Sequence, residues 1–161
     1  MSARLIAIIV VSLWGATPSA AQAPTAGLPR ELRARVQEGR FDAVSSIRGL
    51  PLGVRAELQH LFGAATLEIS ESNGASPATG EIPAARLPRR LVAAGCSQHD
   101  CLVYYELGAP AARTRRVVLF HWTPDATTFE WGGAAPDGLN TFDAVRGAVL
   151  SGAITTSPGP W

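Results

Sequence analysis

The residues best suited to chemistry lie together in the stretch Cys96-Ser97-Gln98-His99-Asp100-Cys101, which holds both cysteines of the chain. An imidazole and a carboxylate side by side can bind a partner, ligate a metal or transfer protons. Because the N-terminus indicates export, we expect these two cysteines to form a disulfide. Such close cysteines suit a bridge across the end of a β-hairpin, with His99 and Asp100 at a tip that faces solvent or a partner.

Two other kinds of chemistry remain open for the same stretch. A zinc site would use Cys96, His99 and Cys101 with His121 as a fourth ligand, although the CxxHxC spacing matches no familiar structural zinc pattern. A redox cysteine pair would have the CxxC spacing, which this stretch lacks. We therefore expect neither a metal nor another cofactor.

The CxxHDC spacing from Cys96 to Cys101 resembles the disulfide-closed loop of the inhibitor of vertebrate lysozyme family. Members of that family are periplasmic α+β proteins whose loop histidine plugs the lysozyme cleft. The resemblance implies that His99 is the plug, that Asp100 is its neighbour and that the two cysteines clamp the loop. Lysozyme works with two carboxylic side chains, to which an imidazole can donate a hydrogen bond. Ser97-Gln98 stands where the family typically has Lys-Pro.

Outside the loop, Tyr104-Tyr105-Glu106 followed by Phe120-His121-Trp122 resembles exported proteins of proteobacteria for which no activity is known. Because the sequence indicates export, has a near-neutral charge and contains no catalytic motif, we expect a non-enzymatic binding or interaction module, with an envelope protein or a wall component as its partner. Inhibition of a C-type lysozyme through His99 is the sharper alternative. A small envelope hydrolase that uses Glu106 or Glu130 is the second alternative.

The N-terminus has the pattern of a secretory signal peptide. Arg4 precedes an apolar run from Leu5 to Trp14, and Ala21-Gln22-Ala23 forms an A-x-A cleavage site. The apolar run is about half of the roughly 20 residues that a membrane anchor needs, so we expect cleavage and no transmembrane segment afterwards. Removal of residues 1–23 from the 161-residue chain leaves 138, which predicts one domain, 24–161, in the periplasm or outside the cell.

The charge of the mature chain is balanced. All 14 basic residues are arginines, and loss of Arg4 leaves 13 of them against 13 acidic residues, so we expect no binding to nucleic acid. Two local clusters are basic and are predicted to lie at one end of a sheet, where they form either an anion-binding site or a solvated rim. The clusters are Arg86, Arg89 and Arg90, and Arg113, Arg115 and Arg116.

Hydrophobic periodicity predicts an α+β fold in which an antiparallel meander of four to five strands packs against N-terminal helices and one C-terminal helix. The predicted helices cover 30–39, 51–62 and 141–151, and the predicted strands cover 65–70, 91–95, 102–107, 115–122 and 128–131. Asn140 is expected to cap the last helix, and Gly132-Gly133 to end the sheet.

Three side chains of the predicted sheet have competing interpretations. Glu106 either serves in a carboxylate pair or forms an ion pair with Arg115 or Arg116 on the next strand, and we favour the ion pair. Tyr104 and Trp122 either share one face as a platform for a ligand or pack across strands in the core.

Overall fold

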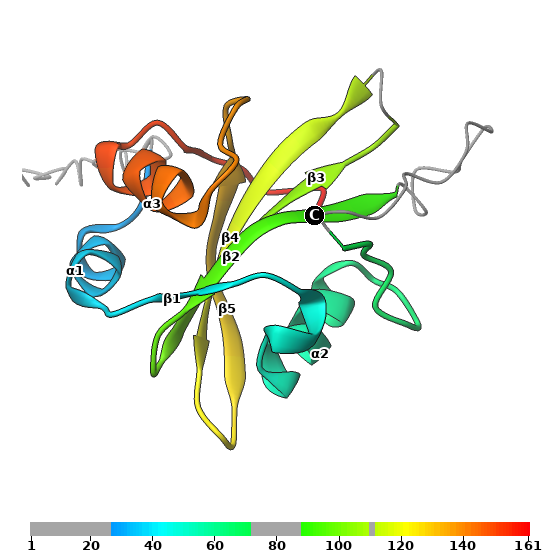
Figure 1. The fold of residues 1–161 in the computed structure, drawn as a ribbon, viewed down its shortest axis with the longest axis horizontal. Coiled ribbons are helices and arrows are strands. Elements are labelled where there is room, and N and C mark those ends of the chain that lie inside the picture. Colours follow the sequence, from blue (N-terminus) through cyan, green and yellow to red (C-terminus); the bar gives the residue numbers. More distant parts are fainter. Residues whose placement is uncertain (1–26, 72–87, 110–111) are drawn as a thin grey trace, which may run out of the picture.

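The computed structural model describes residues 27–71, 88–109 and 112–161, in which one six-stranded antiparallel sheet lies between helices (Figure 1). The strands follow one another in chain order, so the sheet is a meander. Helices α1 and α3 cover one face, and α2 covers the other. The predicted α+β class and meander are confirmed, with six strands in place of four to five.

Three α-helices and one short 3-10 helix accompany the strands. The helices are α1 (Arg30–Glu38), η1 (Ile47–Gly49), α2 (Leu52–Leu61) and α3 (Phe142–Ser151). The strands are β1 (Asp42–Val44), β2 (Arg89–Cys96), β3 (Asp100–Leu107), β4 (Thr114–Trp122), β5 (Thr127–Ala134) and β6 (Thr155–Thr156). Within these ranges, no helix has the length and apolarity that a membrane crossing requires. The predicted signal peptide and Arg86 lie outside the described residues.

The sheet has an apolar core on each face because the central residues of β3 and β4 are hydrophobic on both faces. Toward α1 and α3 these strands direct Leu102, Tyr104, Val117 and Leu119. Toward α2 they direct Val103, Tyr105, Val118 and Phe120. All eight side chains are buried, which confirms the predicted central position of β4 with both of its faces covered.

Helix α1 is held against α3 by arginines that bond to main-chain carbonyls. Arg33 Nη1 donates to the carbonyl of Leu150 at 2.6 Å. From α3, Arg146 donates to the carbonyls of Val36 and Gly39 at 3.0 Å each, at the end of α1 where helical carbonyls lack partners. A helix of nine residues is marginal alone, so these contacts and the shared core fix its position.

The predicted strand at 65–70 is wrong. Only Ser70 pairs there, as an isolated bridge to Arg90 of β2. The alternating Leu67 and Ile69 pack against the α2-side core without strand pairing. The edge of β2 is taken by β1, which pairs with it from Ala94 to Cys96.

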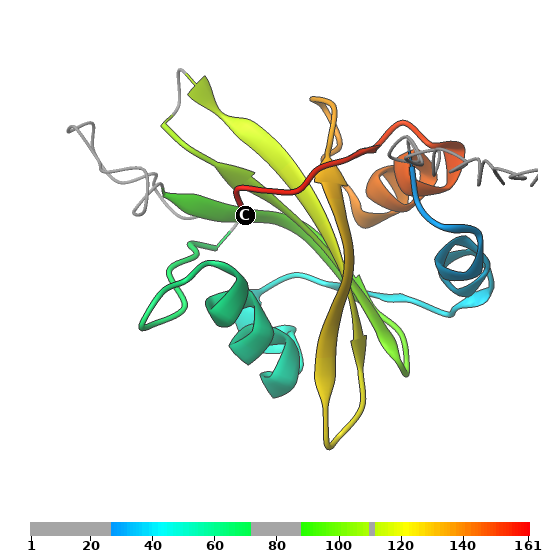
Figure 2. The ribbon, with the colours of Figure 1, turned by 180° about the vertical axis from the view of Figure 1, so that it is seen from behind.

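The predicted sheet break at Gly132-Gly133 is also wrong, because both glycines lie inside β5. A Cβ on Gly132 would collide with the ring of Trp161, whose segment crosses the sheet to end beside β2 (Figure 2). Gly133 pairs with Thr156 of β6, and a Cβ there would meet the backbone of Thr155 at 2.6 Å. The glycines therefore serve close packing rather than a turn.

The boundaries of α3 differ from the prediction at one end. Thr141, not Asn140, caps the helix, because its hydroxyl accepts a hydrogen bond from the amide of Ala144 at 3.2 Å. At the other end, Gly152 has φ 81° and ends the helix as predicted.

Candidate functional site

The tip, residues 96–101, joins β2 to β3 and is closed by a disulfide. Cys96 and Cys101 are register partners with an S–S distance of 2.08 Å and a Cα–Cα distance of 4.1 Å, so the predicted disulfide is confirmed. Inside this ring, Ser97 N donates to the carbonyl of Asp100 at 2.7 Å, and Asp100 N donates to Ser97 Oγ at 3.0 Å. The disulfide and the two hydrogen bonds between Ser97 and Asp100 therefore link the two strands of the tip to each other.

Strand β4 supports the tip from beside it. Trp122 N donates to the carbonyl of His99 at 2.8 Å, and Trp122 Nε1 donates to the carbonyl of Ser97 at 3.2 Å. His99 itself is exposed, and its ring centroid lies 6.1 Å from that of His121. The main chain of His99 is thus fixed while its imidazole faces solvent.

Asp100 does not share this exposure, although the sequence suggests that both tip side chains face outward. It is only 6 % exposed and points to the side of the sheet that α1 covers. There Arg35 of α1 forms an ion pair with its carboxylate through Nη2, and Arg35 Nε lies 3.4 Å from Asp100 Oδ2. The tip is therefore tied to a helix that lies far from it in the sequence.

Two more side chains complete this contact, and we call the four residues Arg35, Asp100, His121 and Glu130 the Arg35 cluster. Arg35 Nη1 donates to Glu130 Oε2 at 3.0 Å. His121 Nδ1 lies 3.1 Å from Arg35 Nη2 and 3.4 Å from Asp100 Oδ1.

Glu130 reaches Arg35 because it is the extra residue of a β-bulge. Leu119 of β4 pairs with Trp131, while Phe120 pairs with Phe129, which leaves Glu130 without a partner on β4. A bulge re-aims a side chain relative to the regular alternation of a strand. The carboxylate thus joins the same face as Asp100.

The Arg35 cluster holds its guanidinium as a cation between two carboxylates. The hydrogen bond that Arg35 donates to Asp100 raises the pKa of Arg35 and outweighs partial burial, which lowers it. Both carboxylates are engaged by Arg35, so the ionisable side chain that the tip offers to solvent is His99.

The arrangement does not provide a metal centre. The disulfide consumes the two thiolates that the zinc alternative requires, so that alternative is overturned. Across residues 27–71, 88–109 and 112–161, no group of three or more His, Cys, Asp and Glu side chains is placed to hold a metal ion.

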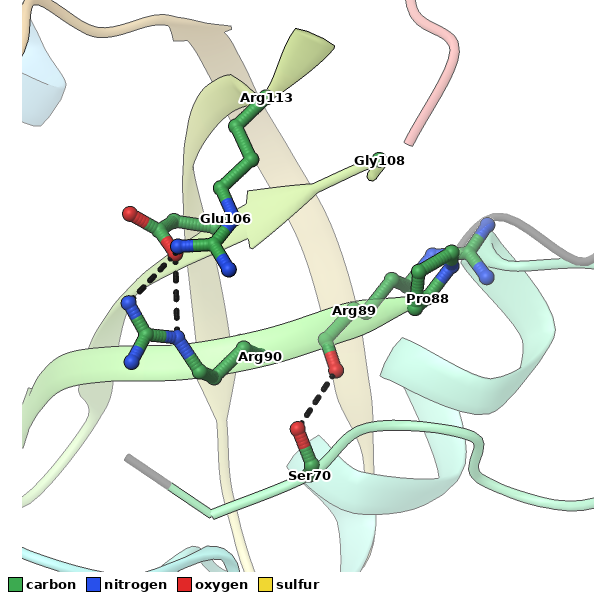
Figure 3. A pocket seen from close by; sticks show the side chains of 7 residues that line it. All are labelled: Ser70, Pro88, Arg89, Arg90, Glu106, Gly108 and Arg113. Carbon is green, nitrogen blue, oxygen red and sulfur yellow. Dashed lines mark hydrogen bonds and ion pairs between the residues drawn. The ribbon is translucent and has the colours of Figure 1, made fainter. Parts of the chain in front are cut away.

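A second charged cluster surrounds Glu106 (Figure 3). Glu106 lies on β3, near the end of the strand opposite to Asp100. Two arginines donate to its carboxylate, Arg90 Nη2 at 2.6 Å and Arg113 Nη1 at 3.1 Å. Arg115 forms an ion pair with it, with Nη2 3.1 Å from Oε1. Burial raises the pKa of Glu106. The hydrogen bond from Arg90 and the positive charges of the three arginines together lower it by more, so the pKa lies below its ordinary value. The predicted ion pair with Arg115 is confirmed.

The hollow beside Glu106 is too small for a ligand. Its volume is about 10 Å³, which is room for a single water. The remaining arginines of this end belong to the other face: Arg89 donates to the carbonyl of Trp161 at 2.6 Å, and Arg116 donates to that of Pro160 at 3.1 Å. The described arginines of the two clusters do meet at one end of the sheet, and their contacts are with the protein itself.

The acids considered for a hydrolase do not form a pair. Glu106 lies opposite Arg115 near one end of the sheet, whereas Glu130 lies at the bulge in the middle of β5, and each is bonded to arginine. The aromatic platform is also wrong, because Tyr104 is buried on the α1 side and Trp122 packs on the α2 side.

Sequence reasoning missed Arg35, whose partners lie 65 to 95 residues away along the chain. One signal was present: Arg35 lies three residues after Leu32, at the border of the apolar stripe of α1, where a charge can reach a neighbouring element. Comparison of the chain with protein-family models, with curated proteins and with solved structures gives no match.

Proposed function

We propose that this chain is an exported, non-enzymatic binding module of the cell envelope that presents His99 on the tip to a protein partner. The observation that carries the proposal is the contrast within the tip. Its backbone is fixed by the disulfide and by Trp122, whereas the His99 side chain is exposed. A binding element ordered before it meets its partner loses less entropy on association.

The partner that best suits such a tip has a concave site lined with carboxylates. A tight hairpin end is convex, and an imidazole can donate hydrogen bonds to carboxylate oxygens. The cleft of a C-type lysozyme has this chemistry, with two catalytic carboxylic side chains. We therefore propose lysozyme inhibition as the specific activity of the module.

The state of the acidic side chains supports a non-enzymatic class. A general acid for sugar or peptide hydrolysis needs a raised pKa, whereas the arginines lower the pKa of Glu106. Asp100 and Glu130 share the guanidinium of Arg35. Each of these carboxylates forms an ion pair within the protein, which favours a structural role for it over a catalytic one.

Lysis of bacterial cell walls by a C-type lysozyme, followed as turbidity, tests the proposal. The purified protein at micromolar concentration should slow lysis, and His99→Ala should weaken inhibition by about 30-fold or more, as loss of a central interface residue does. His60→Ala is the matched control, because His60 is a surface histidine on α2 with 86 % of its side chain exposed. It should inhibit like the wild type.

Two results would count against this function. Absence of inhibition by the wild-type protein would remove lysozyme as the partner. Capture of the same envelope proteins by the wild type and by His99→Ala would remove the tip as the binding surface.

A further inference from the structure

We propose that Arg35 of α1 is the positioning residue of the tip, which sets the direction of His99 by holding the neighbouring Asp100. This inference rests on the proposed function only where it concerns affinity for a partner. Its structural part concerns the free protein.

Asp100 is the means by which a distant helix can control the tip. It follows His99 directly, and its carboxylate is almost fully buried. A buried carboxylate needs a counterion, and without one it turns toward water or unfolds its surroundings locally. Rotation of Asp100 toward solvent would also break the bonds of its backbone to Ser97 and move the adjacent His99.

Arg35 is suited to this role by its shape. Its planar guanidinium reaches Asp100 through Nη2 and Nε while Nη1 donates to Glu130 at 3.0 Å. Lysine presents a single charged point and cannot make these contacts together. The main chain that carries Arg35 is also fixed, because Arg146 of α3 donates hydrogen bonds to carbonyls at the end of α1.

The other restraints on the tip act on different atoms. The disulfide fixes the two ends of the loop, and Trp122 bonds the main-chain carbonyls of Ser97 and His99. The side chain of Asp100 is held by the Arg35 cluster. Loss of Arg35 should therefore loosen residues 97–100 while leaving the strands of the sheet paired.

Amide hydrogen exchange in the free protein tests the structural part. In Arg35→Met, which keeps the aliphatic contacts, exchange at His99 and Asp100 should become about tenfold faster, with β3 and β4 unchanged. Arg30→Met is the matched control on the same helix, because Arg30 is exposed at the start of α1. It should leave exchange in the tip at the wild-type rate. A merely structural role of Arg35 would instead speed exchange across the sheet.

A second variant tests the cause. Asp100→Asn added to Arg35→Met removes the unpaired charge, so exchange in the tip should return toward the wild-type rate. Exchange as fast as in Arg35→Met alone would overturn the argument from the buried carboxylate. Wild-type exchange in Arg35→Met would overturn the whole inference.

The affinity part is measured with lysozyme. Dissociation from Arg35→Met should be about tenfold faster than from the wild type, and Arg30→Met should match the wild type. Equal dissociation from Arg35→Met and the wild type would overturn positioning for binding. If the wild type does not bind lysozyme, the proposed function fails, and hydrogen exchange still decides whether Arg35 orders the tip.

Discussion

Replacement of Glu106 by glutamine should destabilise the fold by about 2 kcal/mol near neutral pH. Removing one partner of a buried ion pair costs about 3–5 kcal/mol because the other charges stay behind. Here the side chain of Glu106 is 7 % exposed, but those of its three arginines keep 21–32 % of their exposure, so water screens part of their repulsion. Asp137 also remains bonded to Arg115. The glutamine oxygen can still accept one arginine N–H, which lowers the cost further.

The dependence on pH gives the sign of the effect. The folded protein lowers the pKa of Glu106 below its ordinary value of 4.5. The unfolded chain therefore binds the proton more readily, and the stability from Glu106 is complete above pH 4.5 and is lost as pH falls through the folded pKa. The difference between wild type and Glu106→Gln should be constant near neutrality and should shrink in acid.

Urea unfolding followed by tryptophan fluorescence between about pH 3 and 7 measures both effects. Glu57→Gln is the control, because Glu57 is half-buried on α2 and its carboxylate lies 4.0 Å from the exposed side chain of His60. It should change the free energy of unfolding by less than about 0.5 kcal/mol. A free energy of unfolding for Glu106→Gln within about 0.5 kcal/mol of the wild-type value, with the same dependence on pH, would refute the reasoning.

Three further predictions concern elements that support the tip and the helices. Thiol titration of the unfolded protein should find no free thiol before reduction, and replacement of Cys96 and Cys101 by serine should cost about 2 kcal/mol in urea unfolding, the entropy of so short a loop. Thr141→Ala should cost about 1 kcal/mol by the same measurement, because α3 loses its cap. Gly95→Ala should cost about 1–3 kcal/mol, because the new methyl group meets the ring of Phe142; an unchanged midpoint would contradict this packing.

Local patterns were sufficient to predict the central part of the fold. The apolar stretches in 102–107 and 115–122, which are separated by turn-forming residues, predicted β3 and β4, since a strand covered on both faces is apolar on both. The disulfide also followed from the sequence, because the two cysteines lie close together in a chain that is predicted to be exported.

The short strands at the two edges of the sheet could not be predicted from local patterns. Strands β1 and β6 have three and two residues, too few to show a period, and they exist because the edges of β2 and β5 offer them bonds. The converse error at 65–70 has the same cause, because alternation favours a strand only where an unpaired edge is within reach.

The same distinction between local pattern and tertiary packing applies to the candidate site. The position of His99 and Asp100 between two cysteines depends on covalent neighbours alone and can be read from the sequence. The exposure of His99 and the burial of Asp100 against Arg35 depend on packing and cannot be read from it. The reason is that Arg35, His121 and Glu130 reach Asp100 from α1, β4 and β5, and only the packing of α1 on α3 and the bulge in β5 bring them together.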